Sequence, residues 1–406
     1  MLKPYYKKLS RSLGIAAIAL ALATVSCQEN QELPTMEMED QFLNYQHGDI
    51  IPGSFIVVLN PDNITFRKNG EYEENLKAMR IAVNGILSKY RISDDKLGHV
   101  YAATLDGFAV RLNKEEYENL KNDPSIKYIE ADRIVSIAQG KGKPGGGGES
   151  TGQEVPWGIS RVGGFVNYSG SNVAWVIDTG IDLTHPDLNV SSTNGFTAFT
   201  SGKDANLNDG NGHGTHVAGT IAALNNSVGV VGVAAGAPVV PVKVLDSRGS
   251  GSYTGVIAGV DWVGGKGKSG DVANMSLGGP ASQALDDAVL AASNKGIKFV
   301  LAAGNSSADA GNYSPARVNG SNIWTISAMN SSDVFASFSN FGNPPVDYCA
   351  PGVSIKSTWK SGSYNTISGT SMAAPHAAGV LLLGTAKSSG NVKEDPDGNA
   401  DPIISR

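Results

Sequence analysis

The chain has 406 residues, which is enough for more than one domain with a sizeable core. Its formal net charge of −6 argues against nucleic acid as the main partner. Only two cysteines occur, Cys27 and Cys349, and two cannot build a disulfide framework or a cysteine-based zinc site.

The N-terminal segment has the pattern of an export signal. Basic side chains are concentrated in residues 1–11, and residues 13–25 are apolar over a length too short for a membrane span. Cys27 follows a small residue, as at a bacterial lipoprotein cleavage site, although the usual upstream leucine is absent. We expect a lipoprotein-type signal peptide over 1–27 with a lipid on Cys27, then a polar tether over 28–49. Plain secretion is the alternative.

The next segment, residues 50–138, predicts a small α/β domain. Its hydrophobic patterns and turn signals give a βαββαβ order, with strands over 54–59, two within 99–112 and one over 127–137, and helices over 71–90 and 114–122. This order is that of a ferredoxin-like unit, an architecture with many functions. Because a glycine-rich linker over 139–154 separates it from a larger domain, its position suits a pro-domain.

The larger domain, residues 155–390, alternates strand and helix patterns. Strands are predicted over 172–177, 238–245, 272–276 and 298–302, and helices over 217–224, 254–263 and 283–295. This alternation predicts a mostly parallel sheet with helices on both faces, and in such sheets sites form at the carboxyl ends of strands. We interpret residues 391–406 as an acidic, solvated tail.

Three polar side chains stand out in this domain. Asp178 ends an apolar strand, although a turn role is the alternative and Asp182 is a competitor. His213 lies in a glycine-rich stretch at the start of a predicted helix, and His216 follows one turn later. The two histidines could form a metal pair, but no third ligand has a clear spacing. Ser371 lies in the first turn predicted for a helix, where the backbone N–H groups favour a developing negative charge.

An Asp, a His and a Ser together can perform nucleophilic catalysis. A serine hydroxyl is a weak nucleophile until a base takes its proton, and neutral histidine can do so near physiological pH. A carboxylate orients the imidazole and stabilises its charged form. The chain order Asp, His, Ser is the order found in subtilisin.

The three stretches that contain these residues resemble the signature motifs of the subtilisin-like serine peptidases (subtilases). The resemblance covers about 155–387, is closest in detail to the proteinase K branch, and extends to 50–138, which is similar to the family's inhibitory pro-domain. It implies a catalytic triad of Asp178, His213 and Ser371, and an oxyanion-hole amide from Asn305.

The resemblance also implies a peptide-binding cleft. An extended substrate is expected to pair as a strand with backbone at Gly249, Ser250, Gly251, Ser276, Leu277 and Gly278. Ala302, Ala303 and Gly304 would form the opposite wall of the P1 pocket. These walls are small and uncharged, so we expect a broad preference for apolar or aromatic P1 residues.

No cofactor is expected for the chemistry, but a structural calcium ion is a weaker expectation. Asp347 is similar to a calcium-binding carboxylate of the proteinase K branch, with carbonyl ligands expected near Ser321 and Ile323. Residues 395–401 also look calcium-like, although they do not follow the EF-hand spacing, and a solvated tail is the preferred interpretation.

The combined reading is an exported serine endopeptidase made as a zymogen, with polypeptide substrates and its own pro-domain as inhibitor and folding aid. We expect a monomer, either anchored by lipid at the outer membrane or cell surface or secreted after the pro-domain is removed. Self-cleavage is expected between about 136 and 156. Two alternatives are an inactive peptide-binding protein on the same scaffold and a metal hydrolase that uses His213 and His216.

Overall fold

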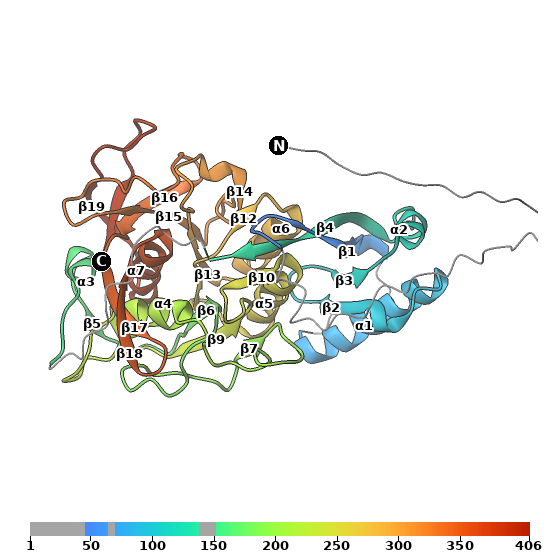
Figure 1. Cartoon of the computed structure of the whole chain (residues 1–406), viewed down its shortest axis with the longest axis horizontal. Coiled ribbons are helices and arrows are strands. Elements are labelled where there is room, and N and C mark those ends of the chain that lie inside the picture. The colour runs from blue at the N-terminus through green and yellow to red at the C-terminus, as the bar shows by residue number, and fades with distance from the viewer. Residues whose placement is uncertain (1–44, 64–69, 138–151) are drawn as a thin grey trace, which may run out of the picture. The chain divides into compact units, whose positions relative to one another are not determined.

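The computed structural model describes residues 45–63, 70–137 and 152–406 (Figure 1). The predicted signal peptide, Cys27, the tether up to residue 44 and most of the glycine-rich linker lie outside these ranges. Across the described residues, we find no helix with the length and apolar character needed to cross a membrane.

The N-terminal domain has the predicted βαββαβ order. Its elements are β1 (Ile50–Leu59), α1 (Tyr72–Lys89), β2 (Leu97–Tyr101), β3 (Gly107–Arg111), α2 (Lys114–Leu120) and β4 (Ile126–Ser136). The strands form an antiparallel sheet in the order β4-β1-β3-β2. The apolar stripe of α1 packs on this sheet, with Met79, Val83 and Leu87 buried in one cluster with Phe108. The ferredoxin-like unit expected from the sequence is therefore confirmed.

The second domain is built on a nine-stranded sheet. Its order is β19-β20-β16-β15-β13-β11-β6-β9-β7, and all neighbours pair in parallel except β19 and β20. Its strands are β6 (Ala174–Asp178), β7 (Phe196–Thr197), β9 (Val239–Lys243), β11 (Val272–Met275), β13 (Lys298–Ala302), β15 (Ile323–Met329), β16 (Val346–Pro351), β19 (Lys387–Asn391) and β20 (Pro402–Ser405).

Short strands and helices complete this domain. The short strands are β5 (Val166–Asn167), β8 (Ala234–Ala235), β10 (Ser250–Ser252), β12 (Gly279–Pro280), β14 (Tyr313–Ser314), β17 (Ile355–Trp359) and β18 (Ser363–Ile367). The helices are α3 (Trp157–Arg161), α4 (His213–Ala222), α5 (Tyr253–Lys266), α6 (Gln283–Ser293) and α7 (Thr370–Leu383).

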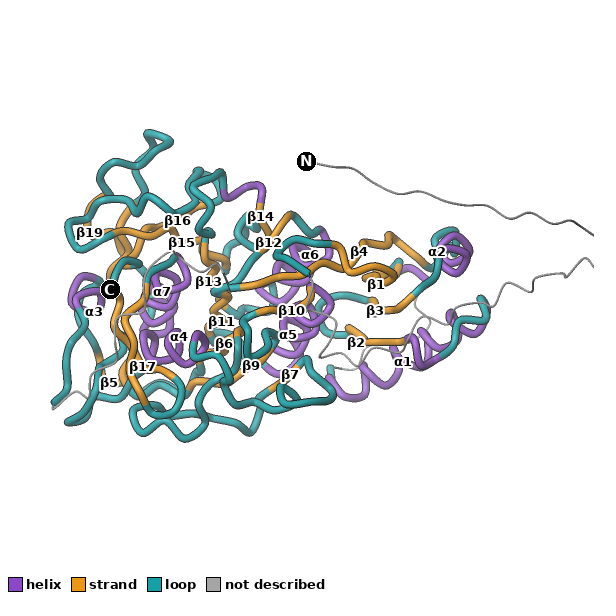
Figure 2. Tube along the Cα trace, viewed as in Figure 1, coloured by secondary structure: helices purple, strands orange, loops and turns teal. Residues whose placement is uncertain are grey.

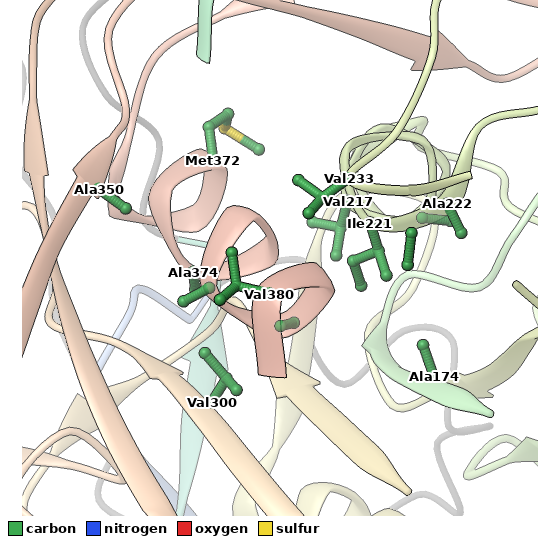
Figure 3. Packing of buried hydrophobic residues seen from close by; sticks show 14 of the residues in the cluster. Ala174, Val217, Ile221, Ala222, Val233, Val300, Ala350, Met372, Ala374 and Val380 are labelled. Carbon is green, nitrogen blue, oxygen red and sulfur yellow. The ribbon is translucent and has the colours of Figure 1, made fainter. Parts of the chain in front are cut away.

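Helices cover both faces of the large sheet, as the alternation predicted. Side chains along a strand point to opposite faces in turn. Val176 of β6 accordingly lies in one buried cluster with α4 and α7, whereas its neighbours Trp175 and Ile177 lie in another with α5 and α6. Figure 3 shows the first of these clusters, in which Val217 and Ile221 of α4 lie close to α7. The helices that begin with the candidate histidine and serine are thus fixed by one core.

Helix α4 starts earlier than the sequence pattern predicts. The predicted range was 217–224, but the helix begins at His213. The carboxylate of Asp209 accepts hydrogen bonds from the N–H groups of Gly212 (2.8 Å) and Thr215 (3.0 Å), which would otherwise have no intrahelical partner. This capping by a side chain outside the helix offsets the low helix propensity of the glycines.

The C-terminal segment is not a solvated tail. Strand β20 joins the large sheet through pairing of Ile403 with Cys349 of β16, and both Ile403 and Ile404 are buried. Asp401 is also buried, and the hydroxyl of Ser327 donates to it. Residues 391–406 therefore belong to the peptidase fold, because three apolar residues in an otherwise polar segment, Val392, Ile403 and Ile404, complete its core.

Candidate active site

Asp178 is the last residue of β6, between β11 and β9 in the centre of the sheet. Its side chain is fully buried, so the carboxylate depends on donors from the protein. The N–H of Thr179 donates to Oδ1 at 2.7 Å, and the imidazole of His213 contacts both carboxylate oxygens.

His213 is the first residue of α4, and its ring is aimed at Asp178. Nδ1 lies 2.8 Å from Oδ1 and 2.9 Å from Oδ2 of Asp178. Burial alone would lower the pKa of His213, but the charges of Asp178 and Asp209 outweigh burial and raise it. With Nδ1 donating to the carboxylate, Nε2 is the ring nitrogen left to act as a base.

The glycines around His213 permit this close approach. A Cβ on Gly214 would come within 2.1 Å of the carbonyl oxygen of Gly180, so only glycine fits between α4 and the loop after β6. Gly212 has a φ of +115°, a backbone conformation that other residues rarely adopt. The glycine-rich stretch is therefore a packing requirement of the histidine's position.

Ser371 is the second residue of α7, and it is buried at the end of β11. Its hydroxyl donates to the carbonyl oxygen of Ser276 at 3.1 Å, and the Ser276 hydroxyl donates to the carbonyl oxygen of Ser371 at 2.9 Å. Among the described residues the Ser371 hydroxyl has no hydrogen bond to His213 in this state. Such contacts are often long before substrate binds, and rotation about one side-chain bond re-aims the hydroxyl.

Asn305 lies beside the N-terminus of the same helix. Its Oδ1 accepts hydrogen bonds from the N–H and the hydroxyl of Thr370, each at 2.9 Å. Since the oxygen is held by the residue next to Ser371, the NH₂ is the end of the amide that acts as donor. This arrangement fits an oxyanion hole formed with the first turn of α7.

The predicted substrate-binding backbone lines two edges, and β4 of the N-terminal domain lies between them. Strand β10 pairs antiparallel with β4, so that Gly251 faces Val135 and Ser250 faces Ser136 (Figure 2). On the other side, Ser136 forms an antiparallel bridge with Gly278. These are the strand-pairing contacts that an extended peptide would make.

The proposed walls of the P1 pocket follow neighbouring strands. Ser276, Leu277 and Gly278 come directly after β11, whereas Ala302 ends β13 and is followed by Ala303 and Gly304. Strands β11 and β13 pair in parallel, so both segments lie at the same edge of the sheet as Asp178.

Other sequence candidates have structural roles. Asp182 is buried, not solvated as expected for a turn residue, and its carboxylate accepts from the N–H groups of Thr184 and Gly362. His216 is buried with Nε2 3.0 Å from the carbonyl oxygen of Ile355, and burial lowers its pKa to about 3. Within the described residues, no cluster of three His, Cys, Asp or Glu side chains is arranged to hold a metal.

Two buried carboxylates were not recognised from the sequence. Asp209 accepts five hydrogen bonds beside His213. Asp261 of α5 accepts five from the N-terminal domain, donated by Tyr72 and by residues 102–104. Asp261 is the one acidic residue in the otherwise apolar sequence of α5, and a charged residue in such a helix indicates that another part of the protein packs against it.

This geometry defines a serine peptidase of the Asp-His-Ser type: a buried carboxylate orients a histidine at the start of α4, and a serine lies at the N-terminus of α7, which shares a core with α4. Comparison with known proteins agrees. Residues 170–392 match the subtilase family and residues 54–138 match the peptidase inhibitor I9 family, so the chain belongs to the subtilase family and carries an I9 pro-domain. It is a serine endopeptidase by class; placement in the proteinase K branch stays a prediction.

Characterised relatives are similar over most of the chain. Alkaline serine exoprotease A of Vibrio alginolyticus is 40% identical over 82% of this chain and 60% of its own length. An extracellular serine proteinase of Thermus sp. is 37% identical over 91% of this chain and 88% of its own. A crystal structure of a cold adapted subtilisin-like serine proteinase has a TM-score of 0.54 and 41% identity, covering 61% of this chain and 97% of that one.

Proposed function

We propose that this protein is an exported subtilisin-like endopeptidase, made as a zymogen, that forms an acyl-enzyme on Ser371. The observation that carries this proposal is the pair of Asp178 and His213, joined at 2.8 Å beside the helix that begins at Thr370. The names of the relatives, which include an extracellular proteinase, favour export.

In this mechanism His213 acts first as base and then as acid. Nε2 takes the proton of Ser371 as its oxygen attacks the peptide carbonyl, and returns it to the leaving amine. Asp178 stays ionised and stabilises the imidazolium. The NH₂ of Asn305 and the N–H of Ser371 would stabilise the oxyanion of the tetrahedral intermediate. In the second half of the reaction His213 takes a proton from water, which attacks the acyl group, and then returns the proton to the oxygen of Ser371 as the acyl group leaves.

The end of the pro-domain supports autoinhibition and self-cleavage. Val135 and Ile137 are buried in the same apolar cluster as Leu277 of the cleft, and the N–H of Ile137 donates to the carbonyl oxygen of Gly249 at 3.0 Å. Ser136 bridges Gly278, two residues after Ser276, whose carbonyl oxygen accepts from the hydroxyl of Ser371. We therefore propose that the enzyme cuts its own chain shortly after Ile137, within the expected range of about 136 to 156.

The contacts of Val135 and Ile137 with the peptidase domain also support a proposal for substrate specificity. We propose broad cleavage after apolar or aromatic residues, with further apolar residues preferred at the upstream positions that correspond to Val135 and Ile137. Nothing acidic lies in the described walls of the P1 pocket at 276–278 and 302–304.

The decisive experiment is fluorophosphonate labelling combined with processing of the full chain. We expect label on Ser371, and a mature protein whose N-terminus, by sequencing, lies within the range of about 136 to 156. Ser371→Ala expressed alone should be neither labelled nor cut. An unlabelled wild type would favour the inactive peptide-binding alternative, and inhibition by chelator but not by the serine reagent would favour the metal hydrolase.

The membrane anchor and the calcium ion are further proposals. Lipidation of Cys27 predicts incorporation of radioactive fatty acid, and an unlabelled wild type would contradict it. For calcium, burial raises the pKa of Asp347 to about 6, and the N–H of Thr325 is the donor recorded for it among the described residues. A partly buried carboxylate with so few donors fits a cation ligand. Chelator should lower the Tm of the wild type but not of Asp347→Asn; an unchanged wild-type Tm would remove the proposal.

A further inference from the structure

Asp209 is linked by hydrogen bonds to Thr179, which follows Asp178 in the sequence, and through Thr179 to Gly214, which follows His213. Its Oδ1 accepts from the hydroxyl of Thr179 at 2.9 Å, and that hydroxyl in turn accepts from the N–H of Gly214 at 2.9 Å. Thr179 follows Asp178, the last residue of β6, and Gly214 follows His213 in α4. One buried carboxylate therefore fixes the distance between the two elements that carry the acid and the base of the proposed triad.

The same carboxylate holds the N-terminus of α4. Oδ1 also accepts from the N–H groups of Asn211 (2.9 Å) and Gly212 (2.8 Å), and Oδ2 accepts from the N–H (3.0 Å) and the hydroxyl (2.7 Å) of Thr215. The Thr215 hydroxyl accepts in turn from the N–H of Asp182, in the loop after β6. Five donors on two oxygens, with the residue only 2% exposed, leave no place for an amide NH₂.

We infer that Asp209 is a positioning residue for the proposed reaction, which acts on His213 through Thr179 and the first turn of α4. This inference rests on the proposed function and adds a second carboxylate to its machinery. Asp209 does not touch the reacting atoms; it sets the angle at which the imidazole meets Asp178.

The charge of Asp209 also acts on the imidazole. The charged or titratable groups around His213 are Asp178, Asp209 and His216, with the ammonium of Lys243 bound to the carbonyl oxygen of Thr179. Asp178 and Asp209 both raise the pKa of His213. Because the base must be neutral to act, loss of the Asp209 charge should move the acid limb of the pH profile to lower pH.

The test compares Asp209→Asn with Asp271→Asn in the processed enzyme. Asp271 is a matched control: it is also 2% exposed and accepts four hydrogen bonds, but it precedes β11 at the opposite edge of the sheet. Rates on one peptide substrate are measured from about pH 4 to about pH 9 and normalised to sites titrated by fluorophosphonate.

We expect Asp209→Asn to lower kcat by about 10²-fold, the size of effect expected when reacting groups are misplaced by about 1 Å, with KM within about twofold and the acid limb at lower pH. Asp271→Asn should lose stability but keep kcat and the pH profile. An Asp209→Asn profile equal to that of Asp271→Asn would overturn the inference. A wild type that neither labels nor hydrolyses would instead reject the proposed function.

A second variant covers the case in which Asp209→Asn does not fold. Thr179→Val removes the hydroxyl link to Gly214 and keeps the charge of Asp209. We expect a similar loss of kcat without movement of the acid limb. A Thr179→Val enzyme with wild-type kcat would show that the link does not position the histidine, and would overturn the inference.

Discussion

Ser276 and Ser371 exchange two hydrogen bonds, each hydroxyl donating to the other residue's carbonyl oxygen. The Ser276 hydroxyl also accepts from the side-chain amide of Asn274 at 2.9 Å. The first turn of α7 is thereby held against the end of β11, so the position of Ser371, the proposed nucleophile, depends on hydrogen bonds made by Ser276.

Ser276→Ala tests this dependence. The substitution leaves the carbonyl oxygen of Ser371 and the amide of Asn274 without their partner, which should lower stability by about 1–3 kcal/mol. We expect kcat to fall by about tenfold with little change in KM, because about 1.4 kcal/mol of lost positioning corresponds to that factor. Thermal unfolding and steady-state kinetics measure the two effects, and a wild-type kcat would contradict the prediction.

Asn305→Ala should remove one donor of the proposed oxyanion hole. We expect kcat to fall by about 10²–10³-fold, the range measured for the corresponding donor in subtilisin, while KM changes little. Asn319→Ala is a suitable control, because that amide is exposed and, within the described part of the chain, donates to the nearby carbonyl oxygen of Arg317. Equal effects of the two substitutions would exclude a specific role for Asn305.

Gly214→Ala should disturb the contact between α4 and the loop after β6. The new Cβ would lie 2.1 Å from the carbonyl oxygen of Gly180, and that backbone cannot move without moving Asp178. We expect a loss of about 1–3 kcal/mol in the free energy of unfolding, with a fall in activity. Gly152→Ala, which meets nothing within 4 Å, should leave both unchanged. Wild-type activity in Gly214→Ala would refute the steric argument.

Acid should weaken the binding of the pro-domain to the peptidase domain, because His99 becomes protonated. Burial lowers its pKa to about 4, although its hydrogen bond to the backbone of Ala198 works in the opposite direction. A lowered pKa means that the bound state takes up fewer protons, so the stabilisation is complete above about pH 6.5 and is lost as the pH falls toward about 4. Asp132 opposes this trend, because burial raises its pKa to about 6 and its protonation favours the bound state.

Hydrogen exchange of pro-domain amides in the Ser371→Ala zymogen measures this effect. We expect protection to rise with acid in a His99→Gln background, because the stabilising protonation of Asp132 remains while the opposing contribution of His99 is lost. His185→Gln, in the peptidase domain, should follow the parent. Identical pH profiles for all three proteins would show that His99 does not control the interface.

The fold followed from local patterns, because strand and helix periodicities are written in consecutive residues. The order of elements in the N-terminal domain was predicted in this way, as was the alternation of strands and helices between β6 and β13 in the larger domain. The start of α4 was not, since the cap is the side chain of Asp209, four positions upstream, and its reach depends on a loop conformation. Strand β20 was missed because its pairing partner, β16, is more than fifty residues away, and the polar loop before Ile403 concealed two core residues.

The candidate site could be predicted as a set of residue types but not as a geometry. The motifs identified Asp178, His213 and Ser371, whereas the link through Thr179 to Asp209 is visible only when the two segments are brought together. The same holds for Asp261, whose five donors all come from the other domain.

Because β4 pairs with β10, cleavage of the chain after β4 and the start of enzymatic activity should be two separate events. Breaking one bond after β4 leaves this pairing, the buried Val135 and Ile137 and the contacts of Asp261 in place, so a processed molecule still has its cleft filled. Activity would begin only when a pro-domain dissociates, and the first free enzyme can digest the pro-domains of its neighbours. Activation of a population of molecules should therefore be autocatalytic, with a lag that shortens as the protein concentration rises.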